Sequence, residues 1–131
     1  MAQKLILRKR DGQMIRCETN THFSSSLREL KVIGTDGGIR SVPLNDLKAV
    51  FFVQDFEGNP AYRPTSEYSE ESPKAGKSVT VTFPDGEILR GRVLSIPEGG
   101  AGFFLFPADP LENNEKVFVV RAPDVVVEVD E

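Results

Sequence analysis

The two halves of this sequence resemble each other. Ser41–Val53 align without a gap on Val117–Val129, and both segments read as a strand, a tight corner and a second strand. An Asp-Gly pair also stands near the start of each half, at Asp11-Gly12 and at Asp85-Gly86. Asp-Gly between apolar stretches signals a two-residue β-hairpin turn, because glycine accepts positive φ at no steric cost. The chain is therefore expected to contain two copies of one small β unit.

Apolar patterns place five strands in each copy. In the first copy they are expected within the hairpin Lys4–Cys17 and at Leu30–Gly34, Ile39–Pro43 and Ala49–Val53. In the second copy they are expected at Ser78–Phe83, Ile88–Leu94, Phe103–Phe106, Lys116–Arg121 and Val125–Val129. No long segment shows the 3.6-residue apolar period of an amphipathic helix. A strand, a one-turn corner and a strand are how small five-stranded barrels close. We therefore predict an all-β protein of two tandem SH3-like or Sm-like barrels.

The expected domains are a first barrel at 1–60, a linker at 61–75 and a second barrel at 76–131. The linker is rich in proline, serine and acidic residues. Such a composition buries too little apolar surface to offset the entropy of ordering. Each barrel has about 50 residues, near the lower limit for an independent core, so the two are expected to lean on each other.

Composition excludes several classes of function. The chain has 131 residues and a net charge of −4, which argues against broad nucleic-acid binding, since that binding relies on Lys and Arg. A single cysteine, Cys17, rules out an internal disulfide. No apolar stretch approaches the roughly 20 residues of a membrane helix. No signal peptide is expected either, because the apolar stretch Leu5–Leu7 is only three residues long before the basic Arg8–Arg10. We expect a cytoplasmic protein with no membrane association.

Two long stretches, LKAVFFVQDFEGNP at Leu47–Pro60 and GFFLFPADPLENNEKVFVV at Gly102–Val120, carry a resemblance to a known family. The chain resembles an uncharacterised bacterial domain of unknown function, often found beside PilZ domains or in proteins of signalling pathways. The likeness covers nearly the whole chain. It implies a bacterial, cytoplasmic protein and brings no known activity and no catalytic residues.

The PilZ neighbourhood suggests cyclic-di-GMP, but the chain lacks a direct motif for it. PilZ proteins use an Arg-x-x-x-Arg element and an Asp/Asn-x-Ser-x-x-Gly element. No two arginines here have that spacing, since Arg8-Lys9-Arg10 runs straight into Asp11-Gly12, and the second element is absent. Any work with this nucleotide is expected to proceed through a partner.

No catalytic, cofactor or metal site is expected. His22 is the only histidine and lies in a polar loop without a nearby nucleophile or orienting acid. Cys17 occupies the position of a strand glycine in the second copy, which favours a small semi-buried residue over a reactive thiol. Asp109, Glu112 and Glu115 lie close together without a calcium-loop spacing, so a solvated turn is the better interpretation.

Basic residues gather in the first copy, at Arg8, Lys9, Arg10, Arg16 and Arg28. They could bind a phosphate or an acidic strip, and one such strip, Glu67–Glu71, lies in the expected linker. A solvated hairpin tip is the simpler alternative.

Certain strands are apolar on both faces, as alternation places Phe103 and Leu105 on one face and Phe104 and Phe106 on the other. The same holds around Phe51. A small barrel uses only its inward face, so the other face must be covered by the other copy, by another subunit or by a partner. We therefore take Phe51, Phe104 and Phe106 as a candidate interaction surface, together with the register-matched residues Arg16 and Arg90.

The function expected from these patterns is that of a non-enzymatic interaction or adaptor module, with a protein partner or a homo-oligomer, and the resemblance implies that it serves bacterial signalling. The alternative is a ligand-binding module for a nucleotide or an RNA segment, with Arg16 and Arg90 as contacts. An enzyme is not expected, because no acid–base pair or nucleophile constellation is present in the sequence.

Overall fold

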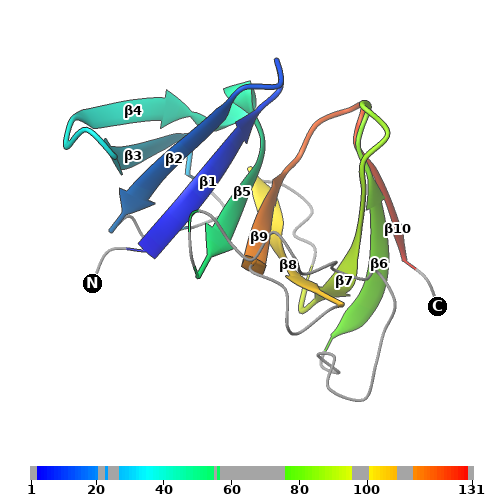
Figure 1. The fold of residues 1–131 in the computed structure, drawn as a ribbon. Coiled ribbons are helices and arrows are strands. Elements are labelled where there is room, and N and C mark those ends of the chain that lie inside the picture. The colour runs from blue at the N-terminus through cyan, green and yellow to red at the C-terminus, as the bar shows by residue number, and fades with distance from the viewer. Residues whose placement is uncertain are drawn as a thin grey trace.

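A computed structural model shows an all-β protein (Figure 1). It describes residues 3–20, 23, 27–54, 56, 76–95, 101–108 and 114–129. The strands are β1 (Gln3–Lys9), β2 (Met14–Thr19), β3 (Glu29–Gly34), β4 (Ile39–Pro43), β5 (Leu47–Val53), β6 (Lys77–Thr82), β7 (Ile88–Val93), β8 (Gly102–Pro107), β9 (Asn114–Val120) and β10 (Val126–Val129). A single turn of 3-10 helix, η1 (Leu44–Asp46), makes the corner between β4 and β5. The all-β class is confirmed, and the expected linker at 61–75 lies outside the described residues.

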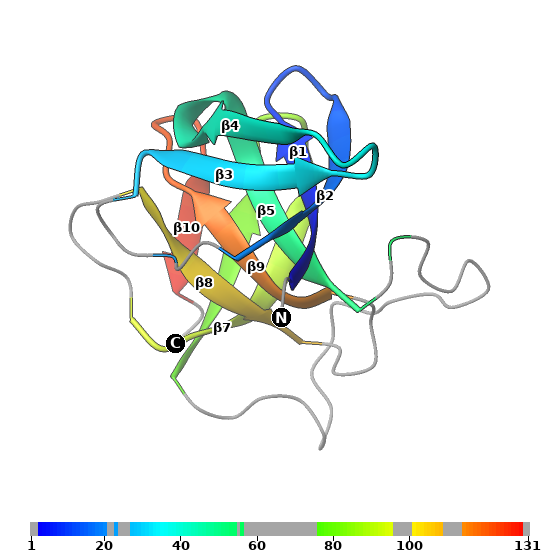
Figure 2. The same cartoon turned by 90° about the vertical axis from the view of Figure 1, so that its left-hand side faces the viewer.

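The strands form one antiparallel sheet in the order β10-β6-β7-β8-β9-β5-β1-β2-β3-β4, and the sheet does not close (Figures 1 and 2). The expected organisation as two tandem barrels is therefore not confirmed. The join lies between β5 and β9, which pair from Ala49↔Val119 to Val53↔Asn114. A strand edge carries unpaired N–H and C=O groups, and β9 satisfies those of β5. The sheet therefore continues from one half of the chain into the other.

The order of strands is the same in the two halves, β5-β1-β2-β3-β4 in the first and β10-β6-β7-β8-β9 in the second. The first hairpin of each half also has the same register. Leu5 lies opposite Cys17 as Val79 lies opposite Gly91. The sequence match between the hairpins thus corresponds to a match in strand pairing.

The turns of these two hairpins share their hydrogen bonds. Lys9 N–H donates to Gln13 O at 2.8 Å and Gly12 N–H donates to Lys9 O at 3.1 Å. Three residues therefore lie between the closing pair, where two were expected. Gly12 takes the left-handed conformation that ends such a loop, with φ of 95°. The second hairpin repeats these bonds, with Gly86 at φ of 92°.

The later strands correspond with a shift of one residue from the ungapped sequence match. Leu30 lies opposite Val42, and Phe103 lies opposite Val119. Gly34 pairs with Cys17 as Pro107 pairs with Gly91, so Leu30 and Phe103, each four residues earlier, are counterparts. Val42 is therefore the counterpart of Val119, whereas the ungapped match places it on Phe118. Because side chains alternate along a strand, a shift of one residue moves each side chain to the other face of the sheet.

Two hydrophobic cores lie on opposite faces of the central strands. The first core contains Leu5, Leu7, Cys17, Leu30, Val32, Val42, Leu44, Leu47, Val50, Phe52, Phe118 and Val120. The second core contains Ala49, Phe51, Val53, Val79, Val81, Phe83, Val93, Phe103, Leu105, Val117 and Val119. Both β5 and β9 contribute to each core in alternation, and all seven residues of β5 are buried. These two strands form the wall between the cores.

Candidate interaction site

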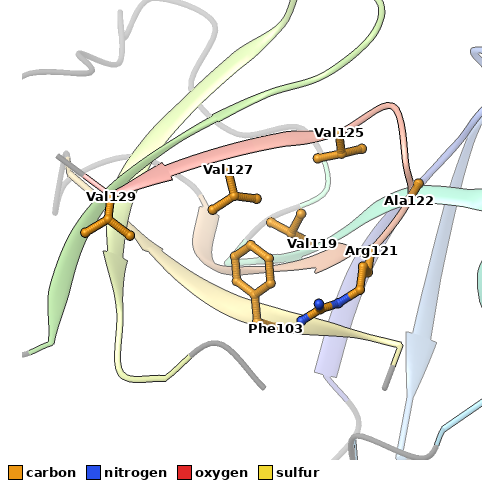
Figure 3. A pocket seen from close by; sticks show the side chains of 7 residues that line it. All are labelled: Phe103, Val119, Arg121, Ala122, Val125, Val127 and Val129. Atoms are coloured by element: carbon orange, nitrogen blue, oxygen red, sulfur yellow. The ribbon is translucent and has the colours of Figure 1, made fainter. Parts of the chain in front are cut away.

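An apolar groove of about 350 Å³ lies along the inner face of β10. Figure 3 shows it between β10 on one side and β8 with β9 on the other. Phe103 and Val119, 5% and 0% exposed, line it from the second core. Val125, Val127 and Val129 line it from β10 and the residue before it, and Arg121 and Ala122 complete the lining. A groove with this lining suits the side chains of an extended apolar segment.

The first half has a counterpart of this groove, and there it is filled. The ladders place Phe52 opposite Leu5 as they place Val129 opposite Val79, so Phe52 is the counterpart of Val129. Phe118 and Val120 of β9 belong to the core at this place and are 3% and 4% exposed. The groove beside β10 thus corresponds to the seat that β9 occupies in the first half.

Among the strands of the described residues, β4 and β10 are the two that pair on one side only. They lie on opposite sides of the molecule (Figures 1 and 2). Each carries apolar side chains in solvent, with Ile39 of β4 72% exposed and Val126 of β10 52% exposed. Such an edge can accept another strand by backbone hydrogen bonding.

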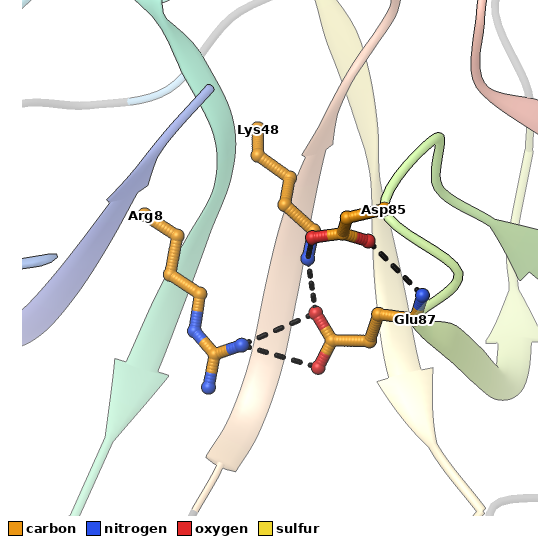
Figure 4. Close-up of polar contacts among 4 residues, drawn as sticks. All are labelled: Arg8, Lys48, Asp85 and Glu87. Carbon is orange, nitrogen blue, oxygen red and sulfur yellow. Dashed lines mark hydrogen bonds and ion pairs between the residues drawn. The ribbon is translucent and has the colours of Figure 1, made fainter. Parts of the chain in front are cut away.

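Four charged residues join the two halves at the wall between the cores (Figure 4), and we call them the ion cluster. The Lys48 side chain is only 11% exposed, and its Nζ donates to Asp85 Oδ2 at 2.8 Å and to Glu87 Oε1. Arg8 Nη1 donates to both carboxylate oxygens of Glu87 at 3.1 Å. Lys48 Nζ also lies 4.6 Å from the centre of the Phe83 ring. The cluster fixes the tip of the second hairpin against β1 and β5.

A further ion pair joins Arg10 to Asp124 at 2.6 Å, beside the corner that leads into β10. The hydrogen bond from Arg10 holds the pKa of Asp124 below its ordinary value of 3.8. The hydrogen bonds from Lys48 and then from the backbone of Glu87 do the same for the pKa of Asp85. These carboxylates favour the charged form because the cations face them.

Of the three phenylalanines expected at an interaction surface, two pack between the halves. Phe51 is 3% exposed and belongs to the second core. Phe104 packs against the first core, with its ring centroid 5.2 Å from that of Phe118 and 5.7 Å from that of Phe52. Phe106 is half-buried on β8, opposite Arg92 of β7.

The structure does not bring Arg16 and Arg90 together. Arg16 is exposed on β2, opposite Ile6, and Arg90 is half-buried on β7, opposite Thr80. Their matched register is thus present, but the strands β8, β9, β5 and β1 separate β7 from β2 in the sheet. Two of the other basic residues of the first copy, Arg8 and Arg10, contact carboxylates of the second half. The acidic strip Glu67–Glu71 lies outside the described residues.

The structure describes only some of the remaining candidates. Cys17 is fully buried, and burial, followed by the nearby charge of Glu18, raises its pKa to about 11, so the thiol stays protonated. His22 lies outside the described residues, as do Asp109 and Glu112. The described part of the chain holds no group of His, Cys, Asp or Glu that could bind a metal. In that same part, no helix is long and apolar enough to span a bilayer.

The sequence-based predictions missed the ion cluster and the groove. A lysine within the apolar run LKAVFFV was a signal, because a buried lysine needs a partner carboxylate. The sequence places Val125, Val127 and Val129 in one strand. They form a groove with Phe103 only because of the way the sheet curves. No sequence pattern reveals that curvature.

These features define a small all-β domain with two cores, an open sheet and an apolar groove at one edge. The chain belongs to a family of unknown function, DUF6982, whose model matches residues 1–128. Neither a curated protein nor a solved structure matches this chain. The family description does not mention PilZ domains or signalling, so those parts of the resemblance remain predictions.

Proposed function

We propose that this protein is a non-enzymatic interaction module in the bacterial cytoplasm, serving signalling through a protein partner. The groove beside β10 carries this proposal. A partner segment in extended form would add to the edge of β10 through backbone hydrogen bonds. Its alternate side chains would enter the groove against Phe103 and Val119. The backbone gives affinity in such a mode, and the groove gives specificity for apolar side chains.

Two further observations support an interaction function over catalysis. The ion cluster connects the halves and is engaged internally, with Lys48 between two carboxylates. Cys17 is protonated and buried, and a lone reduced thiol suits the cytoplasm.

Affinity capture from a bacterial lysate tests this function. Val129, 46% exposed at the groove, is replaced by Asp, and Ile88, 54% exposed on β7, is replaced by Asp as the matched control. We expect Val129→Asp to lose proteins that the unaltered chain and Ile88→Asp both retain. Capture of the same proteins by all three chains would exclude the groove as the binding site.

The nucleotide or RNA alternative ranks lower. Arg16 and Arg90 lie on strands that are not neighbours, and the net charge is −4. Any RNA binding should therefore be weak and fall steeply with salt. Tight binding that resists salt in a gel-shift titration would reverse this ranking.

A further inference from the structure

The join between β9 and β5 can occur again between two copies of the chain. Within one chain it unites the fourth strand of the second half with the fifth strand of the first half. The described part of the chain leaves one more strand of each kind at the ends of the sheet, β4 as a fourth strand and β10 as a fifth. We propose that copies assemble head to tail, with β4 of one copy paired antiparallel to β10 of the next.

The ladders define the register of this pairing. Val42 is the counterpart of Val119, and Phe52 is the counterpart of Val129. Applying the same correspondence to the β5–β9 ladder gives four interchain pairs: Val126 with Val42, Val127 with Ser41, Glu128 with Arg40, and Val129 with Ile39.

The side chains match in this register. Glu128 meets Arg40, so opposite charges face each other across the strands. Val129 meets Ile39, and these residues are 46% and 72% exposed in the single chain. Among the described residues, Arg40 makes an exposed contact of 3.5 Å to Asp36, a weak pairing that a new partner can replace.

The groove beside β10 supplies the seat for the incoming strand. In the first half Phe118 and Val120 fill the corresponding place. In the interchain pairing their counterparts are Ser41 and Pro43, both exposed on β4. Because Ser41 is far smaller than Phe118, it fills the groove less completely. The interchain join is therefore weaker than the intrachain one, and assembly depends on protein concentration.

This pairing uses different surfaces on the two partners, since β4 and β10 lie on opposite sides of the molecule (Figures 1 and 2). Such an interface forms a ring when the rotation closes and a filament when it does not. The inference rests on the proposed function, because it names a second copy as the occupant of the same groove.

Sedimentation of the purified full chain over a wide range of concentration gives the first test. We expect the average mass to rise with concentration. Arg40→Glu and Glu128→Arg alone should each weaken association by about tenfold, since like charges then face each other. The double variant should regain most of the lost association, because opposite charges again face each other between copies. Arg16→Glu, an exposed reversal on β2, is the matched control and should leave assembly unchanged.

Cysteine cross-linking tests the register without relying on charge. A chain with Ile39→Cys and Val129→Cys should give a ladder of covalent multimers on oxidation, because the register places these residues opposite each other. Ile39→Cys with Val126→Cys is the control and should give none, since these positions lie at opposite ends of the pairing. Buried Cys17 is common to both chains.

Three results would overturn the inference: a chain that stays monomeric at every concentration, a double variant as dissociated as the single ones, or equal cross-linking of both cysteine pairs. A monomeric chain that still loses captured proteins on Val129→Asp would leave the proposed function standing. A chain that neither self-associates nor captures proteins through the groove would contradict both the inference and the proposed function.

Discussion

Replacing Phe118 with Ala tests whether a strand of the second half completes the core of the first. The Phe118 side chain is 3% exposed, and its ring centroid lies 5.1 Å from that of Phe23 and 5.2 Å from that of Phe104. Truncating a buried phenylalanine costs about 3–5 kcal/mol, which combines lost burial with the cavity left behind. For a domain stable by about 5–15 kcal/mol, this is a large share of the free energy of unfolding. We expect a fall of about 10–20 °C in melting temperature.

Val117 provides the matched control on the same strand. It is 1% exposed and faces the second core, and truncating it to Ala costs about 2 kcal/mol from the lost methyl groups. Amide hydrogen exchange then shows which strands each substitution destabilises, because weakened strands open more often and exchange faster. Phe118→Ala should lower protection mainly in β1, β2 and β3, although residue 118 belongs to the second half. Val117→Ala should lower it mainly in β6 and β7.

Two results would refute this reasoning. One is a loss below about 1 kcal/mol for Phe118→Ala, which would mean that the ring is not packed in the core. The other is the same pattern of lost protection for both variants, which would mean that β9 does not separate two cores.

Three further predictions follow from local chemistry. The pKa values of Asp85 and Asp124 are lowered in the folded chain, so the charged carboxylates stabilise the fold. This contribution is complete above the ordinary carboxyl pKa of 3.8 and is lost as the pH falls below it. Thermal melts at acidic pH should therefore show a falling melting temperature in that range. Lys48→Met should flatten that fall. Cys17 should resist alkylation in the native chain at pH 8 and react on unfolding, since its pKa is about 11. Gly91→Ala should lower the melting temperature markedly, because a Cβ there would lie 2.2 Å from the carbonyl oxygen of Phe106.

Strand positions were predictable because they depend on local signals. Alternating apolar residues and the Asp-Gly pairs identify the hairpins, and Gly12 and Gly86 both adopt positive φ. The shared use of β5 was not predictable in detail. Every residue of LKAVFFV is buried, and an apolar run carries no mark of which residue faces which core. Pairing with β9 decides it.

The groove and the ion cluster escaped prediction for a different reason. Both depend on bringing together residues far apart in the chain, such as Lys48 and Glu87 in an ion pair, and Phe103 and Val127 in the lining of the groove. Local composition places Arg8 and Arg10 at an apparently solvated hairpin tip. The fold brings carboxylates of the second half to them, and the sequence of the hairpin alone holds no sign of it.

The wall shared by the two cores also sets an order of events during synthesis. A ribosome releases β1–β5 well before it has made β9, yet the first core needs Phe118 and Val120 from that strand. Until then β5 has a bare edge, and Phe52 has only part of its cover, from Phe23. Contacts as distant in sequence as Ala49 with Val119 form slowly, because a long loop must close first. A nascent chain paused before residue 114 thus exposes apolar surface of the kind that chaperones bind, and the N-terminal half completes its core only once β9 has been made.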